Sequence, residues 1–372
     1  MSGTHMLDHP VLEHSVLLDA DSVRILDRRV FPHQEHWLAA RGSDEIAAAI
    51  RDGVTDGSGA LDAALSGMVL VARQHAQHRP GYLLAALRQA ASRLATARPT
   101  DNLVRDAMSE LIADLHDLVE RGGTAAIVAR VEDSVAWLDR RHRARTQALG
   151  RNIVALLDDG AAVLLHGWMD APLMAMIRSS DEAGKTFRYL VAETRPGLEG
   201  ARLTAHTLAE MGQSVTLITD GMIATVLGAL SRLGRVDALV TGTDRVCMDG
   251  HVVATVGTLG AALAAADAGV PYYPLVGAPD PHAPTAADVV LGELDGDGVL
   301  SVLSLRTASP LVSSGYWPAF DVVPPRLVRQ VVTDQGPFET GRLSDYTEPA
   351  ARSRVAPAEP PVPGSVARPA SS

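Results

Sequence analysis

The chain has 372 residues, of which 47% are hydrophobic and 21% charged, which is ordinary for a globular protein with room for two domains. Its net charge of −11 argues against a nucleic-acid-binding protein, because such proteins usually carry a basic face. Its one cysteine, Cys247, excludes an intrachain disulfide and a Cys-rich metal site.

The N-terminal segment lacks the continuous apolar core of a signal peptide, since Asp8, Glu13 and Asp19 interrupt it. The most apolar later stretch, residues 252–276, is rich in Ala and Gly and contains Asp267, unlike a membrane span. We therefore expect a cytoplasmic protein that binds no membrane and no nucleic acid.

Residues 1–150 are predicted to form a small N-terminal domain of strands followed by helices. Short apolar runs at 15–18, 23–26 and 29–31, separated by acidic turns, favour strands. From Ser43, a residue type suited to a helix N-cap, the apolar spacing becomes helical. Helices are expected from Ser43 onward and over 60–78, 82–97, 102–121 and 124–145. A break is expected at Arg98, because a residue that precedes proline disfavours the helical conformation.

Residues 151–336 are predicted to form a doubly wound, mainly parallel Rossmann-like sheet domain, which makes the chain an α/β protein. Apolar strand-like runs at 162–165, 187–192, 214–219, 236–241, 272–276 and 288–291 alternate with helical patterns at 200–211, 222–231 and 259–268. Such alternation is typical of a parallel sheet with helices on both faces. Residues 337–372 are expected to form a tail, disordered from about Glu348, where Pro, Ala and Ser dominate.

Three junctions between a strand-like and a helix-like run carry polar residues, at 193–204, 241–246 and 257–260. In open α/β folds such junctions share the carboxyl edge of the sheet, where ligands bind. Asp244, just past the run 236–240, is the best single candidate for an acid–base group. Its structural alternatives are an ion pair with Arg245 or a helix cap.

Four ordered motifs carry a family resemblance. Residues 193–205 match E-T-R-P-x-x-Q-G-A-R-L-T-A with Glu199 in place of Gln, and residues 242–246 match G-A-D-R-I. Residues 98–103 match R-P-T-x-x-N-L with one residue fewer, and residues 317–324 match N-P-A-F-D-V-T-P. From about Leu17 to about Gly336 the chain resembles the family that joins methylthioribose-1-phosphate isomerase, ribose-1,5-bisphosphate isomerase and the regulatory subunits of the translation-initiation exchange factor 2B.

The resemblance, closest to the isomerase branch, implies a small-molecule sugar or sugar-phosphate ligand, no cofactor and a homodimer that pairs through the C-terminal domain. It also implies that Arg98 meets the ligand's phosphate, a role that suits the planar paired donors of guanidinium. A helix-terminal arginine that bonds backbone carbonyls is the structural alternative.

The chain departs from the family where the chemistry takes place. Gly167 stands where the isomerases have a cysteine that is thought to act with the aspartate, so His166 or Asp170 is the expected replacement base. The family's phosphate-gripping V-R-G-A-P-A loop becomes residues 54–59, with Asp56 near the arginine position, and its Asn-Lys pair becomes Ala254 and Thr255. His166 can equally be a structural histidine bonded to its surroundings.

The predicted site therefore has Asp244 and His166 as catalytic residues, and no metal site is expected. The substrate-binding residues are predicted to be Arg98, Glu199, Asp56, Gly57, Ser58, Ala254 and Thr255. The glycines of this set can also serve tight turns. An anionic Glu199 would repel a nearby phosphate and, with Asp56, favours a less anionic or cationic ligand.

These residues favour an aldose–ketose isomerase acting on a ribose-derived sugar 1-phosphate or analogue, with Asp244 as acid. The alternatives are a non-catalytic ligand-sensing or regulatory protein on the same fold, or a repurposed pathway enzyme with a different substrate. Cys247 lies close to Asp244 in sequence and is a lesser catalytic candidate, since a lone cysteine is more often a buried apolar residue.

Overall fold

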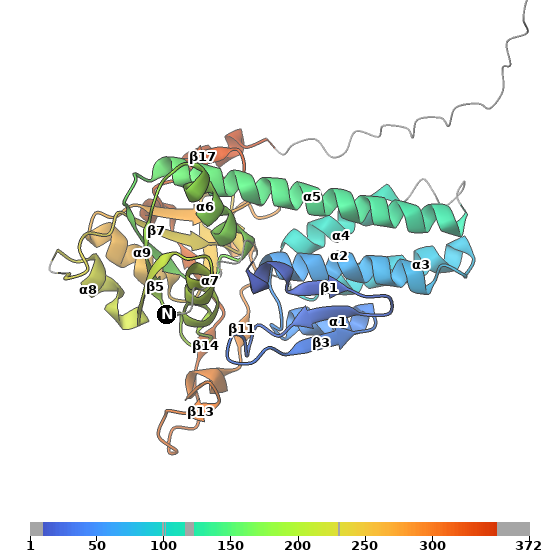
Figure 1. Cartoon of the computed structure of the whole chain (residues 1–372), viewed down its shortest axis with the longest axis horizontal. Coiled ribbons are helices and arrows are strands. Elements are labelled where there is room, and N and C mark those ends of the chain that lie inside the picture. Colours follow the sequence, from blue (N-terminus) through green and yellow to red (C-terminus); the bar gives the residue numbers. More distant parts are fainter. Residues whose placement is uncertain (1–9, 99, 101, 116–122, 230, 348–372) are drawn as a thin grey trace, which may run out of the picture.

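The computed structural model describes residues 10–347 apart from 99, 101, 116–122 and 230. The chain folds into an N-terminal unit of strands and helices and a C-terminal α/β unit, which lie side by side along the long axis of the molecule (Figure 1). The tail expected to be disordered from about Glu348 lies outside the described residues. Every described helix is too short or too polar to cross a membrane.

The N-terminal unit begins with a three-stranded antiparallel sheet of β1 (Val16–Leu18), β2 (Val23–Leu26) and β3 (Trp37–Ala40). The first two strands were predicted. The strand predicted at 29–31 is wrong, because Arg29 lies in a turn in which its backbone amide donates to the Asp27 carboxylate at 3.0 Å. The third strand lies eight residues later.

Five helices complete the unit: α1 (Ser43–Arg51), α2 (Gly57–Gln74), α3 (Pro80–Ala95), α4 (Asn102–Asp114) and α5 (Thr124–Leu156). All were predicted, but α4 ends seven residues before and α5 eleven residues after the predicted ends at 121 and 145. Ser43 is the first residue of α1, and Gly42 rather than Ser43 is its N-cap. Small buried residues such as Ala60 and Ala64 allow α2 to pack closely against its neighbours.

Helix α5 joins the two units. Ile127 and Val131 at its start pack in the N-terminal core, whereas Leu149 and Ile153 near its end pack in the C-terminal core. Figure 1 shows this helix running along both units. The domain boundary predicted at residue 150 therefore falls within a continuous helix.

The C-terminal unit is built on a seven-stranded sheet in the order β17-β16-β10-β7-β4-β5-β6, parallel except for β17. The strands are β4 (Ala162–His166), β5 (Arg188–Ala192), β6 (Ser214–Ile218), β7 (Ala238–Gly242), β10 (Tyr272–Leu275), β16 (Val331–Thr333) and β17 (Gly336–Phe338). The predicted α/β class and mainly parallel sheet are confirmed. The strand predicted at 288–291 is wrong, because a 3-10 turn occupies 286–288 and β16 takes the place next to β10.

Helices cover both faces of this sheet. The end of α5, α6 (Ala171–Glu182) and α7 (Ala205–Glu210), preceded by the π-helical turn η3 (Gly200–Thr204), pack on one face. Helices α8 (Ile223–Leu227) and α9 (Thr258–Asp267) pack on the other. The central strands are buried on both sides, which explains their continuous apolar runs.

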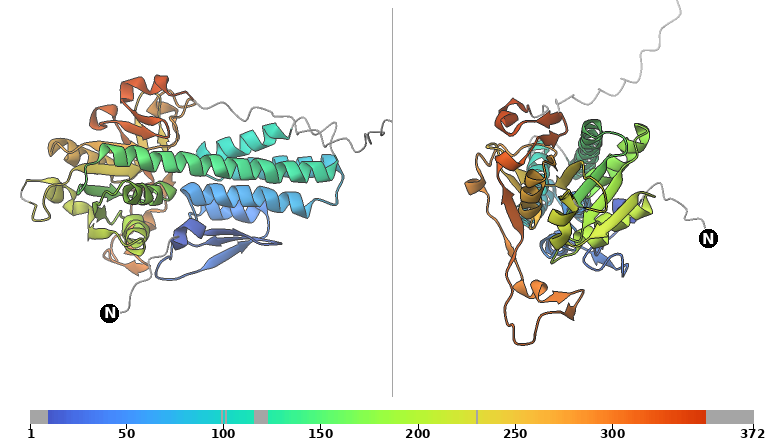
Figure 2. Two further views of the ribbon diagram at one scale, coloured as in Figure 1. Left: turned by 45° about the horizontal axis from the view of Figure 1, so that its top comes forward. Right: turned by 90° about the vertical axis from the view of Figure 1, so that its left-hand side faces the viewer.

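A smaller antiparallel sheet follows β7, formed by β8 (Arg245–Val246), β9 (Val252–Thr255) and β15 (Phe320–Val323). Between β10 and β15 the chain forms an arm with the short strands β11 (Glu293–Leu294), β12 (Ser301–Val302), β13 (Leu305–Arg306) and β14 (Trp317–Pro318). This arm projects away from the body of the molecule (Figure 2).

Candidate active site

A cavity of about 970 Å³ lies at the carboxyl edge of the large sheet, against the N-terminal helices. It collects residues from loops that follow β4, β5 and β7, together with the starts of α2 and α4. The predicted site residues that line it are Asp244, Arg98, Glu199, Asp56, Gly57, Ser58 and Thr255. His166 and Ala254 are buried and do not belong to this lining.

Asp244 and Arg98 meet in this cavity from different units of the molecule. Arg98 Nη2 donates to Asp244 Oδ1 at 3.2 Å, and the two side chains are 26% and 18% exposed. The Asp244 amide donates to the Val253 carbonyl at 3.0 Å, which fixes the residue on β9. The Arg98 guanidinium also lies over the Phe320 ring, 5.7 Å from its centroid. A carboxylate is thus held beside a cation in a partly buried place.

Arg245, the residue after Asp244, serves a different purpose. Its guanidinium pairs with Asp280 at 3.2 Å and donates to the Thr100 carbonyl at 2.9 Å. These bonds tie the segment after Arg98 to the sheet. Arg245 thus pairs with Asp280, and Asp244 forms an ion pair with Arg98, which lies 146 residues away in the sequence.

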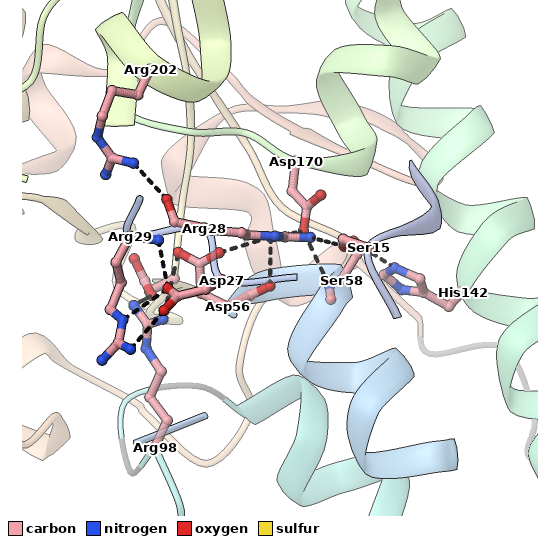
Figure 3. A network of polar contacts seen from close by, with 12 residues as sticks. Ser15, Asp27, Arg28, Arg29, Asp56, Ser58, Arg98, His142, Asp170 and Arg202 are labelled. Atoms are coloured by element: carbon pink, nitrogen blue, oxygen red, sulfur yellow. Dashed lines mark hydrogen bonds and ion pairs between the residues drawn. The ribbon is translucent and has the colours of Figure 1, made fainter. Parts of the chain in front are cut away.

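A buried arginine that the sequence did not single out holds two acids of the cavity wall (Figure 3). Arg28, whose side chain is 3% exposed, donates from Nη1 to Asp56 Oδ1 at 3.0 Å and to Asp170 Oδ2 at 3.1 Å. Its Nη2 donates to Ser15 Oγ at 2.9 Å. Arg28 belongs to no recognisable motif. Its two acidic partners are far from it in the sequence, so their attraction to its charge becomes evident only in the tertiary structure.

Asp170 is the cavity acid closest in sequence to the missing cysteine position. It follows β4 with φ of 54°, a backbone conformation that is strained for a non-glycine residue and is common at functional sites. Burial raises the pKa of its carboxyl, and the Asp56 charge adds to this, while the Arg28 guanidinium opposes both. Its Oδ2 accepts from Arg28 and from the Gly59 amide, the latter at 3.2 Å. In Figure 3 the other oxygen points away from Arg28.

Glu199 stands at the opposite wall, in the loop that leads into η3. Its carboxylate folds over Gly197, where an added Cβ would lie only 1.8 Å from Oε1. Burial raises the pKa of Glu199, and the charges of Arg202 and Arg98 act against this shift. A side chain at 197 would therefore displace the Glu199 carboxylate from this position.

His166 lies behind the cavity rather than in its lining. Its Nδ1 is 3.3 Å from Thr258 Oγ1, and its ring packs on Gly257 so closely that an added Cβ would lie 2.6 Å from Nε2. Burial lowers the pKa of His166, with the charges of Asp220 and Asp321 opposing the shift. This environment favours a neutral ring that supports the start of α9.

Position 167, where the isomerases have cysteine, is built around glycine. Gly167 has φ of +78°, its amide donates to Thr194 Oγ1 at 2.9 Å, and its carbonyl accepts from Thr204 Oγ1 at 2.7 Å. An added Cβ would lie 3.6 Å from Thr255 Oγ1. The Thr255 hydroxyl therefore stands close to the space that a side chain at 167 would enter.

Cys247 is not placed to act as a nucleophile. It is buried in an apolar cluster with Val253 and Phe320, outside the cavity lining. Burial raises the pKa of its thiol to about 11, so the reactive thiolate is disfavoured near neutral pH. Among the described residues, no group of three or more His, Cys, Asp and Glu side chains is arranged to hold a metal ion.

A second cavity of about 190 Å³ lies on the far side of Ser58, His142 and Asp170, residues that it shares with the main cavity. His142 Nε2 is 2.9 Å from Ser58 Oγ, and burial lowers the pKa of this histidine to about 4. Asp62 lines the second cavity on α2, and burial raises its pKa to about 7.

Asp62 is expected to make the protein less stable as the pH rises. Its pKa of about 7 in the folded state exceeds the value of about 4 in the unfolded chain, so between these values the folded state binds more protons. Between about pH 5 and 7, the Asp62 carboxyl should make the free energy of unfolding fall by about 1 kcal/mol per pH unit, and Asp62→Asn should remove this contribution to the slope.

Urea denaturation across this pH range measures the effect, with Asp133→Asn on an exposed part of α5 as the control. Equal pH slopes for the wild type and Asp62→Asn would contradict the expectation.

The comparisons with known proteins agree with this architecture. The sequence model of the Initiation factor 2 subunit family matches residues 54–340. Among curated proteins, "Methylthioribose-1-phosphate isomerase" of Anaeromyxobacter sp. (strain K) is 35% identical over 329 residues, which cover 85% of this chain and 90% of that protein. The protein of the same name from Gemmatimonas aurantiaca is 33% identical, over 88% of this chain and 94% of its own.

Two solved structures are similar over nearly the whole chain. The delta subunit of translation initiation factor eIF-2B from A. fulgidus has a TM-score of 0.72 and 27% identity, covering 87% of this chain and 95% of its own. The 5-methylthioribose 1-phosphate isomerase of Pyrococcus horikoshii OT3 has a TM-score of 0.78 over 91% of this chain and 96% of its own. Its 23% identity supports the shared fold alone.

Proposed function

Because the chain belongs to the Initiation factor 2 subunit family, we propose that it is an aldose–ketose isomerase acting on a ribose-derived sugar, either a 1-phosphate or an analogue. The observation that carries the proposal is the contact between Asp244 and Arg98 inside the main cavity, at the carboxyl edge of the sheet. Curated relatives named as isomerases, 33–35% identical over at least 84% of the chain, support an intramolecular oxidoreductase.

The reaction moves one hydrogen from C2 to C1 of the sugar while the carbonyl shifts from C1 to C2. A proton leaves O2, and one is gained at O1 of a free aldose or at the ring oxygen of a 1-phosphate, whose O1 is esterified; these transfers require acid–base groups on the enzyme. Asp244 serves as the acid in our proposal, since it is partly buried, faces the cavity and is held by Arg98. No cofactor enters this scheme.

We propose Asp170 rather than His166 as the second acid–base group. Asp170 lines the cavity and has a raised pKa, so it can hold a proton closer to neutral pH than an ordinary carboxyl. Arg28 and the Gly59 amide fix one carboxylate oxygen and leave the other for exchange. His166 lies outside the cavity lining and is proposed to position the start of α9 through Thr258.

Replacing Asp170 by asparagine should therefore reduce kcat by about 10²–10³-fold, within the range of a lost acid–base group. The amide can still accept from Gly59 and Arg28, so the fold should be retained. His166→Gln is the matched comparison and should reduce kcat by less than about tenfold, because it disturbs only packing near α9. A larger loss at His166 than at Asp170 would return the role to the histidine.

The proposal as a whole is tested by proton and phosphorus NMR time courses of the purified full chain with 5-methylthioribose and with its 1-phosphate. Conversion of either aldose to its ketose without added cofactor supports an isomerase. Binding of a sugar without conversion of either compound would contradict it and favour the ligand-sensing alternative. The homodimer implied by the resemblance stays a prediction.

A further inference from the structure

One backbone amide at the end of α2 that faces the main cavity is already bound by a carboxylate of the protein itself. The first amides of a helix lack acceptors within it and favour an anion such as a phosphate. Here the Gly59 amide donates to Asp170 Oδ2 at 3.2 Å, a carboxylate from the C-terminal unit. At Gly59 an added Cβ would lie 2.4 Å from Arg28 Nη2, so the guanidinium rests against the helix end. Asp170 thus places a negative charge at the helix end where a phosphate would otherwise be favoured.

Both terminal nitrogens of Arg28 already donate to acceptors of the protein itself. Nη1 donates to Asp56 and Asp170, and Nη2 donates to Ser15. Its side chain is 3% exposed, and the three partners surround it in Figure 3. Two carboxylates face this one guanidinium, so the group as a whole does not attract an anion.

Arg98, a second arginine near this end of the cavity, also lies between two carboxylates. Its Nη2 lies 3.2 Å from Asp244 Oδ1, and its Nη1 lies 3.8 Å from Asp56 Oδ2. A phosphate that approached Arg98 would meet both carboxylates at short range. The like charges would repel it, which selects against an anionic ligand.

Backbone amides at the ends of β5 and β9 are occupied in the same way. The Thr194 and Arg195 amides donate to the two oxygens of Asp220 at 2.9 and 2.6 Å. The Gly257 and Leu259 amides, before and at the start of α9, donate to Asp321 Oδ2 at 2.8 and 2.9 Å. Each of these amide pairs already holds an internal carboxylate, so neither offers a free cradle to a ligand phosphate.

The balance of charge at this end of the cavity therefore favours an uncharged ligand. Beside the start of α2, two guanidinium groups, Arg28 and Arg98, contact three carboxylates, namely Asp56, Asp170 and Asp244. Burial raises the pKa of Glu199, and the Asp56 charge adds a smaller contribution in the same direction. Hydroxyl groups of a sugar can donate to such acids and accept from the arginines, whereas a phosphate dianion cannot donate.

We propose that the substrate is an uncharged aldose that carries no phosphate at the end facing α2. The proposal rests on the isomerase function proposed above and names the substrate class of the same cavity. The reaction is balanced without a co-reactant: the hydrogen on C2 moves to C1, the proton on O2 is lost to the enzyme, and O1 gains one. The aldose and the ketose have the same composition.

The test compares 5-methylthioribose with 5-methylthioribose 1-phosphate on the full wild-type chain, by turnover and by saturation-transfer NMR. We expect the unphosphorylated sugar to be preferred by at least about tenfold in kcat/KM, or in affinity if turnover is absent. An equal or reversed preference, or no binding of the unphosphorylated sugar, would overturn the proposal.

Asp56→Asn supplies a gain of function. The amide keeps an acceptor for Arg28 but removes one negative charge beside both arginines. Its preference should shift toward the phosphate ester by about three- to tenfold. Asp52→Asn is the matched control, since it removes the same charge four residues earlier, at an exposed position outside the cavity lining, and should leave the preference unchanged. The same shift in both variants, or none in Asp56→Asn, would contradict the proposed role of Asp56.

The outcomes separate this proposal from the function on which it rests. Tight binding of the uncharged sugar without turnover would contradict the isomerase and keep the ligand class. Turnover of the phosphate ester in preference to the free sugar would keep the isomerase and overturn the ligand class.

Discussion

Replacing Asp244 by asparagine is expected to lower kcat/KM for aldose–ketose conversion by about 10²–10⁴-fold, the range attributed to a general acid–base group. The amide preserves the size of the side chain and an oxygen acceptor for Arg98, which lies 3.2 Å from Oδ1 in the wild type. What it removes is the proton that the carboxyl exchanges with the sugar. The loss should therefore appear in kcat more than in KM, because binding contacts are kept.

The measurement is an NMR time course with whichever sugar the wild type converts, together with thermal unfolding of each variant. Asp249→Asn is the control, since this acid pairs with His251 and does not line the cavity. It should retain wild-type activity. If Asp244→Asn kept activity within about threefold of the wild type, an acid role for Asp244 would be untenable.

The largest loss of stability is expected from Arg28→Met. Arg28 and Asp170 are 3% and 7% exposed, and removal of one partner of a buried ion pair costs about 3–5 kcal/mol of the free energy of unfolding. The methionine keeps the apolar part of the side chain but leaves Asp170 without its cation. Part of the loss should disappear at low pH, because the Asp170 carboxyl can then be neutral.

The direction of this pH effect follows from the raised pKa of Asp170. A carboxyl whose folded pKa lies above its unfolded value stabilises the fold at acid pH, and this contribution is lost as the pH rises through the folded pKa. Without Arg28 the folded pKa rises further, so the deficit of the variant should grow with pH. Urea denaturation at acid and neutral pH measures it.

Arg73→Met provides the matched control. Arg73 pairs with Glu132 between α2 and α5, with side chains 47% and 42% exposed. Such a surface pair contributes about 0–1 kcal/mol, so the control should unfold close to the wild type at every pH. A similar small loss for Arg28→Met would contradict the view that its network ties the two units together.

The sequence by itself determined the class of fold, because periodicity is a local property. Buried strands such as β4 and β7 appear as continuous apolar runs, and the helices between them keep an apolar face. The two strands that were wrongly predicted lie where the local sequence pattern says little about tertiary contacts. The stretch around Arg29 has strand-like composition but forms a turn in which the Arg29 amide donates to the Asp27 carboxylate. Residues 288–291 are also strand-like, but β16, forty residues later in the chain, is the strand that pairs with β10.

The motifs also predicted a shared site for Asp244, Arg98 and Glu199, and the structure places all three in the lining of one cavity. What the sequence could not determine was how their charges are balanced. Arg28 lies 142 residues from Asp170, and the bond between them exists only because the turn after β2 and the loop after β4 meet in the fold. Burial, proximity and pKa depend on residues far apart in the chain, so only the tertiary structure decided that an internal carboxylate fills the helix end where an anion would otherwise bind.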